Sequence, residues 1–405
     1  MIISYGGKNC WVFKDWFEID FRINKNVPKE YGFESKSVVP LMCFEGPNAS
    51  GKTCALRVLS FLADFCSNSF SYAPDSDVPY DSFFYNRSES EMFITFTLPD
   101  SVEKEYYYEV KFDDMKIKKE KLCDFKGNRK NVIIERDGDI IKKTSLSELK
   151  GFRNSFRPNA SIFSSLYQYG IKSIKPFISF FASIKSNIKY LGRYEDNTLL
   201  DPAKYYHEHP DMLTKVIEEI KKLDTGIRDI KISDYSLPDN SKVYYSVVYN
   251  ETEDGAKPLS HHSMSTGTKM LYTRLKDIFD AINDGGVLVL DELDCHLHSF
   301  LVPKILNYFT DSSINKKCAQ LIFTSHNSSL LDITKKYRTY IFEKEKGEGI
   351  CYRIDELPSS MTSRNDRSLE QTYKSGVIGG IPNVSEGESK EKRKAKKTGR
   401  ELCFF

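Results

Sequence analysis

Phe44-Glu45-Gly46-Pro47-Asn48-Ala49-Ser50-Gly51-Lys52-Thr53 is the stretch that decides the fold. It matches G-x-x-x-x-G-K-[ST], the pattern of a phosphate-binding P-loop. An apolar run over residues 38–44 predicts a buried strand before it, and the spacing of residues 54–65 predicts a helix after it. A glycine-rich turn between strand and helix lets successive backbone N–H groups point at phosphate oxygens. The stretch therefore predicts a nucleotide-phosphate site in an α/β protein, against the plainer alternative of a glycine-rich turn.

The individual P-loop residues have expected roles. Lys52 would neutralise the β and γ phosphates of ATP, and the hydroxyl of Thr53 would bind Mg²⁺. The residues expected to bind ATP here are Gly46, Pro47, Asn48, Ala49, Ser50, Gly51, Lys52 and Thr53.

A second candidate segment lies far along the chain, where Val287-Leu288-Val289-Leu290 runs into two acidic residues. Four consecutive apolar residues predict a strand buried on both faces, and therefore a parallel one. The carboxyl ends of such strands are where open α/β sheets bind ligands. Asp291 would hold Mg²⁺ through water, and Glu292 would polarise an attacking water as general base. The alternative is a pair of solvated acidic residues in a loop.

Histidines follow this segment in two places. His326 comes directly after a second buried strand, predicted over residues 320–324, and from there it can donate a hydrogen bond to a γ-phosphate oxygen. His296 and His298 resemble a metal pair, but with Asp294 they lack an obvious fourth ligand. A packing or interface role is the favoured interpretation for that pair.

A small, polar loop precedes the helix predicted over residues 270–282. Within it, Ser265 is a plausible N-cap, and Gly267 allows the close approach of another backbone.

The bulk properties indicate an ordinary globular protein. The 405 residues are 40% hydrophobic and 29% charged, and the net charge is +2, so no overall field attracts nucleic acid or membrane. Nine scattered cysteines without a CxxC pair indicate reduced thiols in the cytoplasm. No segment approaches the roughly 20 apolar residues that span a bilayer, and we expect no membrane partner.

Changes of pattern along the chain suggest four regions. Residues 1–150 combine the P-loop with an antiparallel β layer, in which Asp137-Gly138 is a hairpin signal. Residues 151–240 are expected to form a helical insertion, because helical spacing occupies 161–191 and 211–223. Residues 241–384 would form a C-terminal lobe, and 385–405 a charged tail. That tail is either solvated or a contact for nucleic acid or a partner.

The order of the motifs resembles the ATPase heads of the ABC and SMC type. It is most similar to the abortive-infection, AAA-labelled branch of those heads, which is related to the overcoming-lysogenization-defect ATPases. The residues that carry the resemblance are Gly46 to Thr53, Ser265-Thr266-Gly267-Thr268, Leu290 to His298, Gln320 to Asn327, Asp366, Tyr373 and Gly376 to Pro382. Together they span nearly the whole chain.

The resemblance implies a P-loop NTPase fold of ABC-head type, with a mostly parallel central sheet, an antiparallel β layer and a helical insertion. It implies that Ser265 and Gly267 complete the ATP site of a second protomer in at least a dimer. It also implies bacterial antiphage defence with a separate effector such as a nuclease, triggered by nucleic acid or a phage protein. The chain departs from the pattern in its Ser-Thr-Gly-Thr signature and in lacking a clear Q-loop glutamine. Gln168 is more simply interpreted as an ordinary helix residue.

Two other functions stay open. A self-contained nucleic-acid enzyme is suggested by the basic tail and by Lys116, Lys118, Lys119 and Lys121. That enzyme would need a carboxylate cluster outside the ATP site, whereas Asp355, Glu356 and Asp366 are dispersed. A nucleotide-dependent scaffold that binds ATP and barely hydrolyses it is the third possibility.

Overall fold

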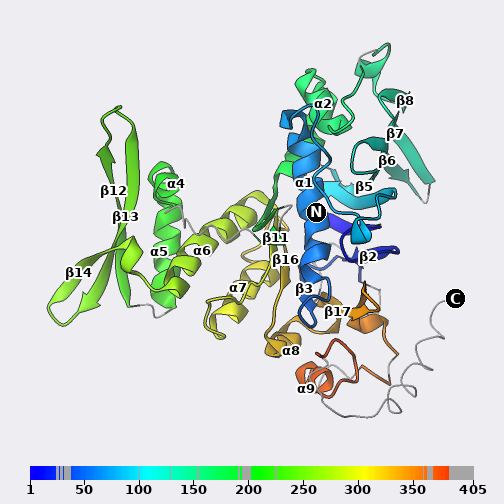
Figure 1. Cartoon of the computed structure of the whole chain (residues 1–405). Coiled ribbons are helices and arrows are strands. Elements are labelled where there is room, and N and C mark those ends of the chain that lie inside the picture. The colour runs from blue at the N-terminus through cyan, green and yellow to red at the C-terminus, as the bar shows by residue number, and fades with distance from the viewer. Residues whose placement is uncertain are drawn as a thin grey trace.

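The structure is a computed structural model (Figure 1). It describes residues 1–23, 27, 31, 38–99, 101–127, 129–152, 155–189, 192–193, 202–223, 226–358, 360–362 and 368–382. The basic tail and Asp366 lie outside these residues. None of the helices described is long and apolar enough to cross a bilayer.

A six-stranded sheet in the order β18-β17-β3-β16-β15-β9 forms the centre of the molecule. Every pairing is parallel except that between β17 and β18. The strands are β3 (Leu41–Glu45), β9 (Ile184–Ser186), β15 (Val287–Leu290), β16 (Gln320–Thr324), β17 (Thr339–Glu345) and β18 (Glu348–Arg353). All residues of β3, β15 and β16 are buried, as their unbroken apolar runs predict.

A seven-stranded antiparallel sheet in the order β2-β1-β4-β5-β6-β7-β8 forms the second layer. Its strands are β1 (Ile2–Lys8), β2 (Phe17–Asp20), β4 (Ser90–Leu98), β5 (Ser101–Phe112), β6 (Ile117–Lys126), β7 (Arg129–Asp137) and β8 (Ile140–Thr144). The predicted hairpin at Asp137-Gly138 is confirmed, with Gly138 at φ 58° in the turn between β7 and β8.

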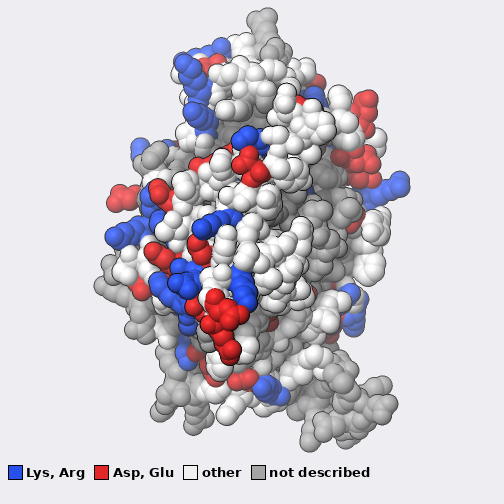
Figure 2. Space-filling model, turned by 90° about the vertical axis from the view of Figure 1, so that its left-hand side faces the viewer, with Lys and Arg blue, Asp and Glu red and all other residues white. Residues whose placement is uncertain are grey.

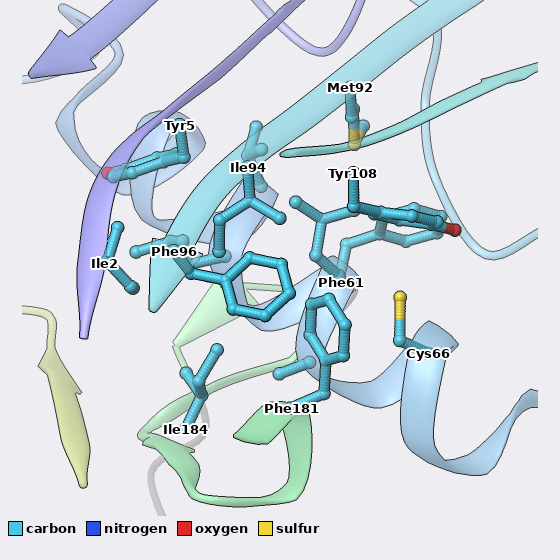
Figure 3. Close-up of a cluster of buried hydrophobic side chains, with 14 of the residues drawn as sticks. Ile2, Tyr5, Phe61, Cys66, Met92, Ile94, Phe96, Tyr108, Phe181 and Ile184 are labelled. Atoms are coloured by element: carbon cyan, nitrogen blue, oxygen red, sulfur yellow. The ribbon is translucent and has the colours of Figure 1, made fainter. Parts of the chain in front are cut away.

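The P-loop helix α1 (Lys52–Asn68) packs between the two sheets. Phe61 and Cys66 of α1 share one core with Phe96 and Tyr108 of the antiparallel sheet and with Phe181 of α3 (Lys175–Ala182) (Figure 3). The Phe96 and Phe180 rings are stacked 4.2 Å apart. This aromatic core fixes the direction of α1, and thereby of the loop at its N-terminus.

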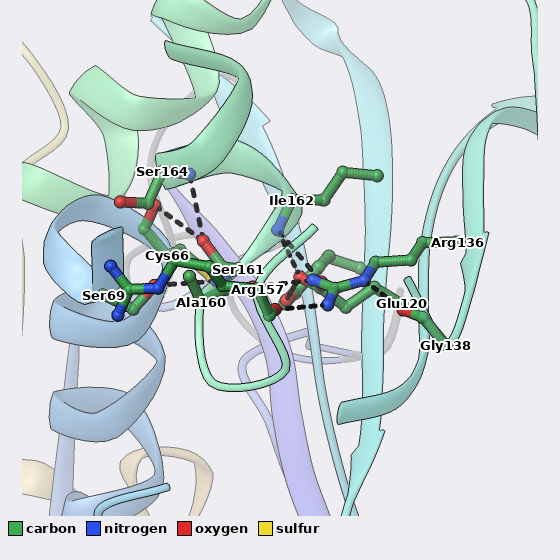
Figure 4. A network of polar contacts seen from close by, with 11 residues as sticks. Cys66, Ser69, Glu120, Arg136, Gly138, Arg157, Ala160, Ser161, Ile162 and Ser164 are labelled. Carbon is green, nitrogen blue, oxygen red and sulfur yellow. Dashed lines mark hydrogen bonds and ion pairs between the residues drawn. The ribbon is translucent and has the colours of Figure 1, made fainter. Parts of the chain in front are cut away.

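A buried ion pair joins the antiparallel sheet to α2 (Ile162–Gln168) (Figure 4). Arg136 and Glu120 are both fully buried, with Arg136 Nη1 donating to Glu120 Oε2 at 2.8 Å. The other oxygen of Glu120 accepts from the Tyr108 hydroxyl, and both accept from the Ile162 backbone N–H. Burial raises the pKa of Glu120, opposed mainly by the charge of Arg136.

The middle of the chain departs from the prediction. Helical spacing over residues 161–191 predicts helix throughout, but α3 (Lys175–Ala182) ends before Ile184 and the chain becomes β9. That strand pairs in parallel with β15 and satisfies backbone groups at its edge. The pairing depends on β15, which lies about 100 residues later in the chain, so the local spacing of apolar residues does not reveal β9 as a strand. The short strands β10 (Ile188–Lys189) and β11 (Gly192–Arg193) follow.

A three-stranded antiparallel sheet projects to one side of the central sheet (Figure 1); we call it the wing. It consists of β12 (Ile227–Ser236), β13 (Lys242–Thr252) and β14 (Gly255–Ser260). Its inner face packs on three helices, α4 (Ala203–Glu208), α5 (Pro210–Lys222) and α6 (Thr266–Asp284). The expected helical insertion is thus part helix and part sheet, and the four regional boundaries remain predictions.

The remaining helices are α7 (Leu301–Thr310), α8 (Leu331–Thr334) and α9 (Leu369–Lys374). Leu369 and Tyr373 lie buried on one face of α9. Asp332 of α8 accepts from the Ser368 hydroxyl at 2.7 Å and from the Leu369 backbone N–H at 2.6 Å. These bonds attach the C-terminal segment to the chain that follows β16.

Candidate nucleotide site

The P-loop has a backbone that only glycine tolerates at two positions. Gly46 and Gly51 have φ of 149° and 110°. A Cβ on Gly46 would lie 2.4 Å from the carbonyl oxygen of Phe342, and one on Gly51 would lie 2.9 Å from Val12 Cγ2. Other segments of the same chain therefore pack against both ends of the loop. Asn48 and Ala49, at the tip of the loop, are exposed.

Lys52 folds back over this loop. Its Nζ donates to the carbonyl oxygens of Gly46 at 2.6 Å and Pro47 at 3.1 Å. Burial lowers the pKa of Lys52, against the opposing effect of Glu45, Asp291 and Glu292. The ammonium group is thus already located where the loop would surround a phosphate.

Glu45, the last residue of β3, is a buried carboxylic acid behind the loop. It is 3% exposed, and its Oε2 has no hydrogen-bond partner among the described residues. Burial raises the pKa of Glu45 to about 8, although the charge of Lys52 opposes the rise. No pattern in the sequence indicated that this glutamate would be buried.

The P-loop and the acidic strand meet at Thr53. Its hydroxyl donates to Asp291, 3.2 Å from Oδ1 and 3.0 Å from Oδ2. Thr324, at the end of β16, donates to Asp291 Oδ1 at 2.7 Å. The start of α1 and the end of β16 therefore converge on the carboxylate that follows β15, and Asp291 is 4% exposed.

This arrangement fits Mg²⁺. A hydroxyl oxygen and a carboxylate are the hard oxygen ligands that Mg²⁺ prefers, usually together with phosphate oxygens. The loop beside them contains the buried Ser50 hydroxyl, which has no hydrogen-bond partner among the described residues. The predicted metal residues, Thr53 and Asp291, are in contact.

Glu292 has φ of 51°, a left-handed conformation that is unusual for a glutamate. Its backbone N–H donates to the Thr324 hydroxyl at 2.7 Å. His326 Nε2 lies 3.7 Å from Glu292 Oε1, and both side chains are partly exposed. The candidate base and the candidate γ-phosphate donor therefore stand side by side at the same sheet edge.

Asp294 holds the loop that carries His326. Its Oδ2 accepts from the Ser325 hydroxyl at 3.1 Å and from the His326 backbone N–H at 3.4 Å. Asp294 is therefore a hydrogen-bond acceptor for the loop that carries His326. His296 and His298 are exposed, and no cluster of three metal-ligating residues occurs in the described part of the chain.

Asn187 is a site residue that the sequence did not reveal. It follows β9, and its Oδ1 accepts from the Asp291 backbone N–H at 2.7 Å while its Nδ2 donates to the Asp291 carbonyl at 3.0 Å. Gln168 instead ends α2 as an exposed residue. No local signal marked Asn187, because the three residues of β9, Ile-Lys-Ser, do not form an apolar run that would predict a strand.

Ser265 and Gly267 belong to a separate face. Ser265 caps α6, its Oγ accepting from the Thr268 backbone N–H at 3.1 Å, which confirms the predicted N-cap. A Cβ on Gly267 would lie 2.6 Å from the His296 carbonyl oxygen. The signature-like loop therefore packs on the segment after Glu292, and no described hydrogen bond joins it to the P-loop of its own chain.

Three of the lysines behind the nucleic-acid alternative lie near acidic residues. Lys118 pairs with Asp113 at 2.5 Å, and Lys119 and Lys121 stand opposite acidic residues of β7 in the sheet register. Arg353 binds Asp355 at 2.5 Å. On the side of the molecule that carries the wing, basic and acidic side chains are interspersed (Figure 2). Acidic residues thus accompany these lysines, and Asp355 is already paired with Arg353.

A cavity of about 770 Å³ lies along α1, lined by residues such as Trp11, Phe61, Phe181 and Ile188. No P-loop residue lines it. It is distinct from the phosphate cradle.

Comparison with known proteins identifies the family of this chain. Residues 41–332 match the family described as "AAA domain, putative AbiEii toxin, Type IV TA system". The chain belongs to this family. The matched range includes the P-loop, the signature-like loop around Ser265, the strand before Asp291, and His326. Comparison with the curated proteins finds no match.

Solved SMC head domains are similar in fold. The SMC head domain from Thermotoga maritima is 13% identical with a TM-score of 0.42, over 87% of this chain and 98% of that one. An Smc head domain with a coiled coil and joint derived from Pyrococcus yayanosii is 9% identical with a TM-score of 0.45, over 92% and 99%. Similarity at this level says nothing about the partners of this chain.

The predicted fold class, a P-loop NTPase of ABC-head type, is confirmed by the family and by the described sheets. Membership of an AAA-type ATPase family indicates nucleotide binding and hydrolysis.

Proposed function

We propose that this protein is a Mg²⁺-dependent ATPase that acts as a nucleotide-driven regulator in antiphage, abortive-infection defence. The observation that carries the ATPase is the contact of Thr53 with Asp291, beside Glu292. It joins the phosphate loop to a carboxylate and a candidate base, which are the parts that ATP hydrolysis requires. The defence role is supported by the family description, which names a toxin of a type IV toxin–antitoxin system.

In this proposal the P-loop backbone and Lys52 bind the triphosphate, while Thr53 and Asp291 would hold Mg²⁺. Bound Mg²⁺ offsets the negative charge that develops on the phosphate oxygens. Glu292 accepts a proton from the attacking water, and His326 donates a hydrogen bond to the γ-phosphate. Asn187 and Thr324 orient the metal-binding carboxylate and its backbone.

The signature-like residues act on a second copy. Ser265 and Gly267 close the ATP site of a partner protomer, so ATP binding pairs two heads and hydrolysis separates them. A difference in ATP affinity between the paired and separate states allows work on a separate effector, such as a nuclease. Nucleic acid or a phage protein is the proposed trigger.

The test is Glu292→Gln. We expect phosphate release to fall at least about 100-fold, because a positioned general base contributes about 10²–10⁴ in rate. ATP affinity should be retained, and the protein should accumulate as an ATP-bound dimer in sedimentation velocity. Glu251→Gln, an exposed substitution on the wing, is the matched control. Normal turnover in Glu292→Gln would show that another group is the base.

A further inference from the structure

The loop that carries His326 is held from two directions. Asp294 accepts hydrogen bonds from the Ser325 hydroxyl and from the His326 backbone N–H. The Ser328 hydroxyl, two residues after His326, donates to Glu370 Oε1 at 3.2 Å. Glu370 belongs to α9 and lies 42 residues further along the chain than Ser328. The position of α9 therefore bears on the position of His326.

Helix α9 is itself fixed to the protein by polar and apolar contacts. The carboxylate of Asp332, in α8, accepts hydrogen bonds at the start of α9, and the two helices lie next to each other (Figure 1). Leu369 and Tyr373 are buried in a cluster that includes Ile341 of β17. The contact with the loop of His326 thus comes from an anchored helix.

The chain that follows α9 packs on the strand beside the P-loop. The Gly380 backbone N–H donates to Glu343 Oε1 at 2.7 Å. A Cβ on Gly380 would lie only 2.6 Å from Ile341 Cγ2, so the chain passes close to β17 here. The carbonyl oxygen of Phe342, in the same part of β17, lies against Gly46 of the P-loop. Residues on both sides of the candidate ATP site are therefore in contact with one C-terminal segment or with the strand that it covers.

We call residues 368–382 the clasp, because they contact both the loop of His326 and the strand beside the P-loop. We propose that the clasp sets the position of His326 relative to the P-loop, and that Glu370 is a positioning residue of the ATP site. This inference rests on the proposed function, in which His326 donates a hydrogen bond to the γ-phosphate. Glu370 acts through Ser328, without contact to nucleotide or metal.

The contact of Glu370 with Ser328 contributes more to position than to stability. The Glu370 side chain is 26% exposed, and the exposed Lys374 pairs with the same oxygen at 2.7 Å. Polar contacts at such sites add little to the free energy of unfolding. A displacement of about 1 Å near a reacting group, by contrast, can slow a reaction about 100-fold. Loss of the contact should therefore slow ATP hydrolysis in a protein that stays folded.

The first experiment measures kcat and the affinity for Mg-ATP in three variants. Glu370→Ala should lower kcat about 10-fold and leave the affinity unchanged, because Lys52 and the P-loop backbone are intact. Glu370→Gln keeps an oxygen that can accept from Ser328 and should restore most of the rate. Lys374→Ala removes only the ion pair and is the matched control, with the turnover of the parent. An unchanged kcat in Glu370→Ala, or equal losses in the Ala and Gln variants, would overturn the inference.

The second experiment determines whether the effect passes through His326. Single-turnover rates are compared in the parent and in a His326→Ala background. Residues that act as one unit are not additive, so Glu370→Ala should cause little further loss once His326 is removed. A loss of the same size in both backgrounds would show that Glu370 does not act through His326.

Hydrogen exchange gives a measurement that does not depend on turnover. Amides of residues 325–330 should exchange faster in Glu370→Ala than in Lys374→Ala, while those of the P-loop should be the same in both. Equal exchange over 325–330 would refute the positioning by Glu370.

The outcomes separate the two proposals. A parent chain that hydrolyses ATP no faster than Glu370→Ala refutes the positioning and leaves the ATPase intact. A parent chain that binds ATP and shows no turnover refutes the proposed function, and the positioning that rests on it.

Discussion

Asn187 shows how one residue can serve a reaction without touching the substrate. Its amide bonds both the N–H and the C=O of Asp291, so it fixes the backbone of the residue proposed to hold Mg²⁺. Partners that orient a metal ligand matter because the ligand must be presented in a single geometry.

We predict that Asn187→Ala lowers kcat about 10- to 100-fold, the usual effect of removing such an orienting partner. ATP binding in the presence of EDTA should be unchanged, whereas the Mg²⁺ concentration for half-maximal rate should rise. Gln168→Ala is the control and should behave as the parent. Equal loss in both variants would indicate general damage to the fold.

Glu45 gives a prediction about pH at the same scale. Its pKa is raised by burial to about 8, above the value of about 4.5 for an exposed glutamate. The folded state therefore keeps a proton that the unfolded state loses, and stability contributed by neutral Glu45 declines as pH rises from about 4.5 to about 8.

We predict that Glu45→Gln removes this component. The free energy of unfolding of the variant, relative to the parent, should increase between pH 5 and pH 8, by at most about 1.4 kcal/mol per pH unit for one proton. Urea titrations across this range measure it. Parallel profiles for variant and parent would mean that Glu45 is ionised in the folded protein.

At the scale of elements, the buried Arg136–Glu120 pair joins β6 and β7 to the N-terminus of α2. Besides Glu120, Arg136 donates to the carbonyl oxygens of Gly138, Ala160 and Arg157, so every side of the guanidinium is occupied. Removal of one partner leaves a buried charge without compensation.

We predict that Arg136→Met lowers the free energy of unfolding by about 3–5 kcal/mol. Adding Glu120→Gln should restore part of the loss, since Gln can still accept from Tyr108 and Ile162. Lys142→Met removes a surface pair with Asp137 and should cost about 1 kcal/mol or less. Urea unfolding measures all three, and a surface variant as damaging as the buried one would refute the assignment.

At the scale of the whole molecule, the two sheets and α1 share one hydrophobic core, and α6 leads from the wing to β15 of the central sheet. Strand β14 runs directly into the signature-like loop, and the inner face of the wing shares a hydrophobic core with α6. The wing is therefore connected to the face proposed to meet a partner protomer in two ways. Strand β14 leads into that face, and the wing shares a hydrophobic core with α6.

The sequence by itself determined the local elements of the site. The P-loop, the buried strands ending at Glu45, Asp291 and Thr324, the N-cap Ser265 and the hairpin at Gly138 all follow from apolar runs, capping and turn chemistry. Such signals operate over a few residues, and they were sufficient to predict Lys52, Thr53 and Asp291 as one set.

Only the tertiary structure decided where distant segments meet. Strand β9 was predicted as helix because its three residues carry little local signal, while its position depends on the open edge of β15. Once β9 is placed, Asn187 reaches Asp291. The burial of the acid Glu45 likewise depends on what the folded chain covers. Burial and strand pairing depend on the whole chain at once, and no local pattern contains them.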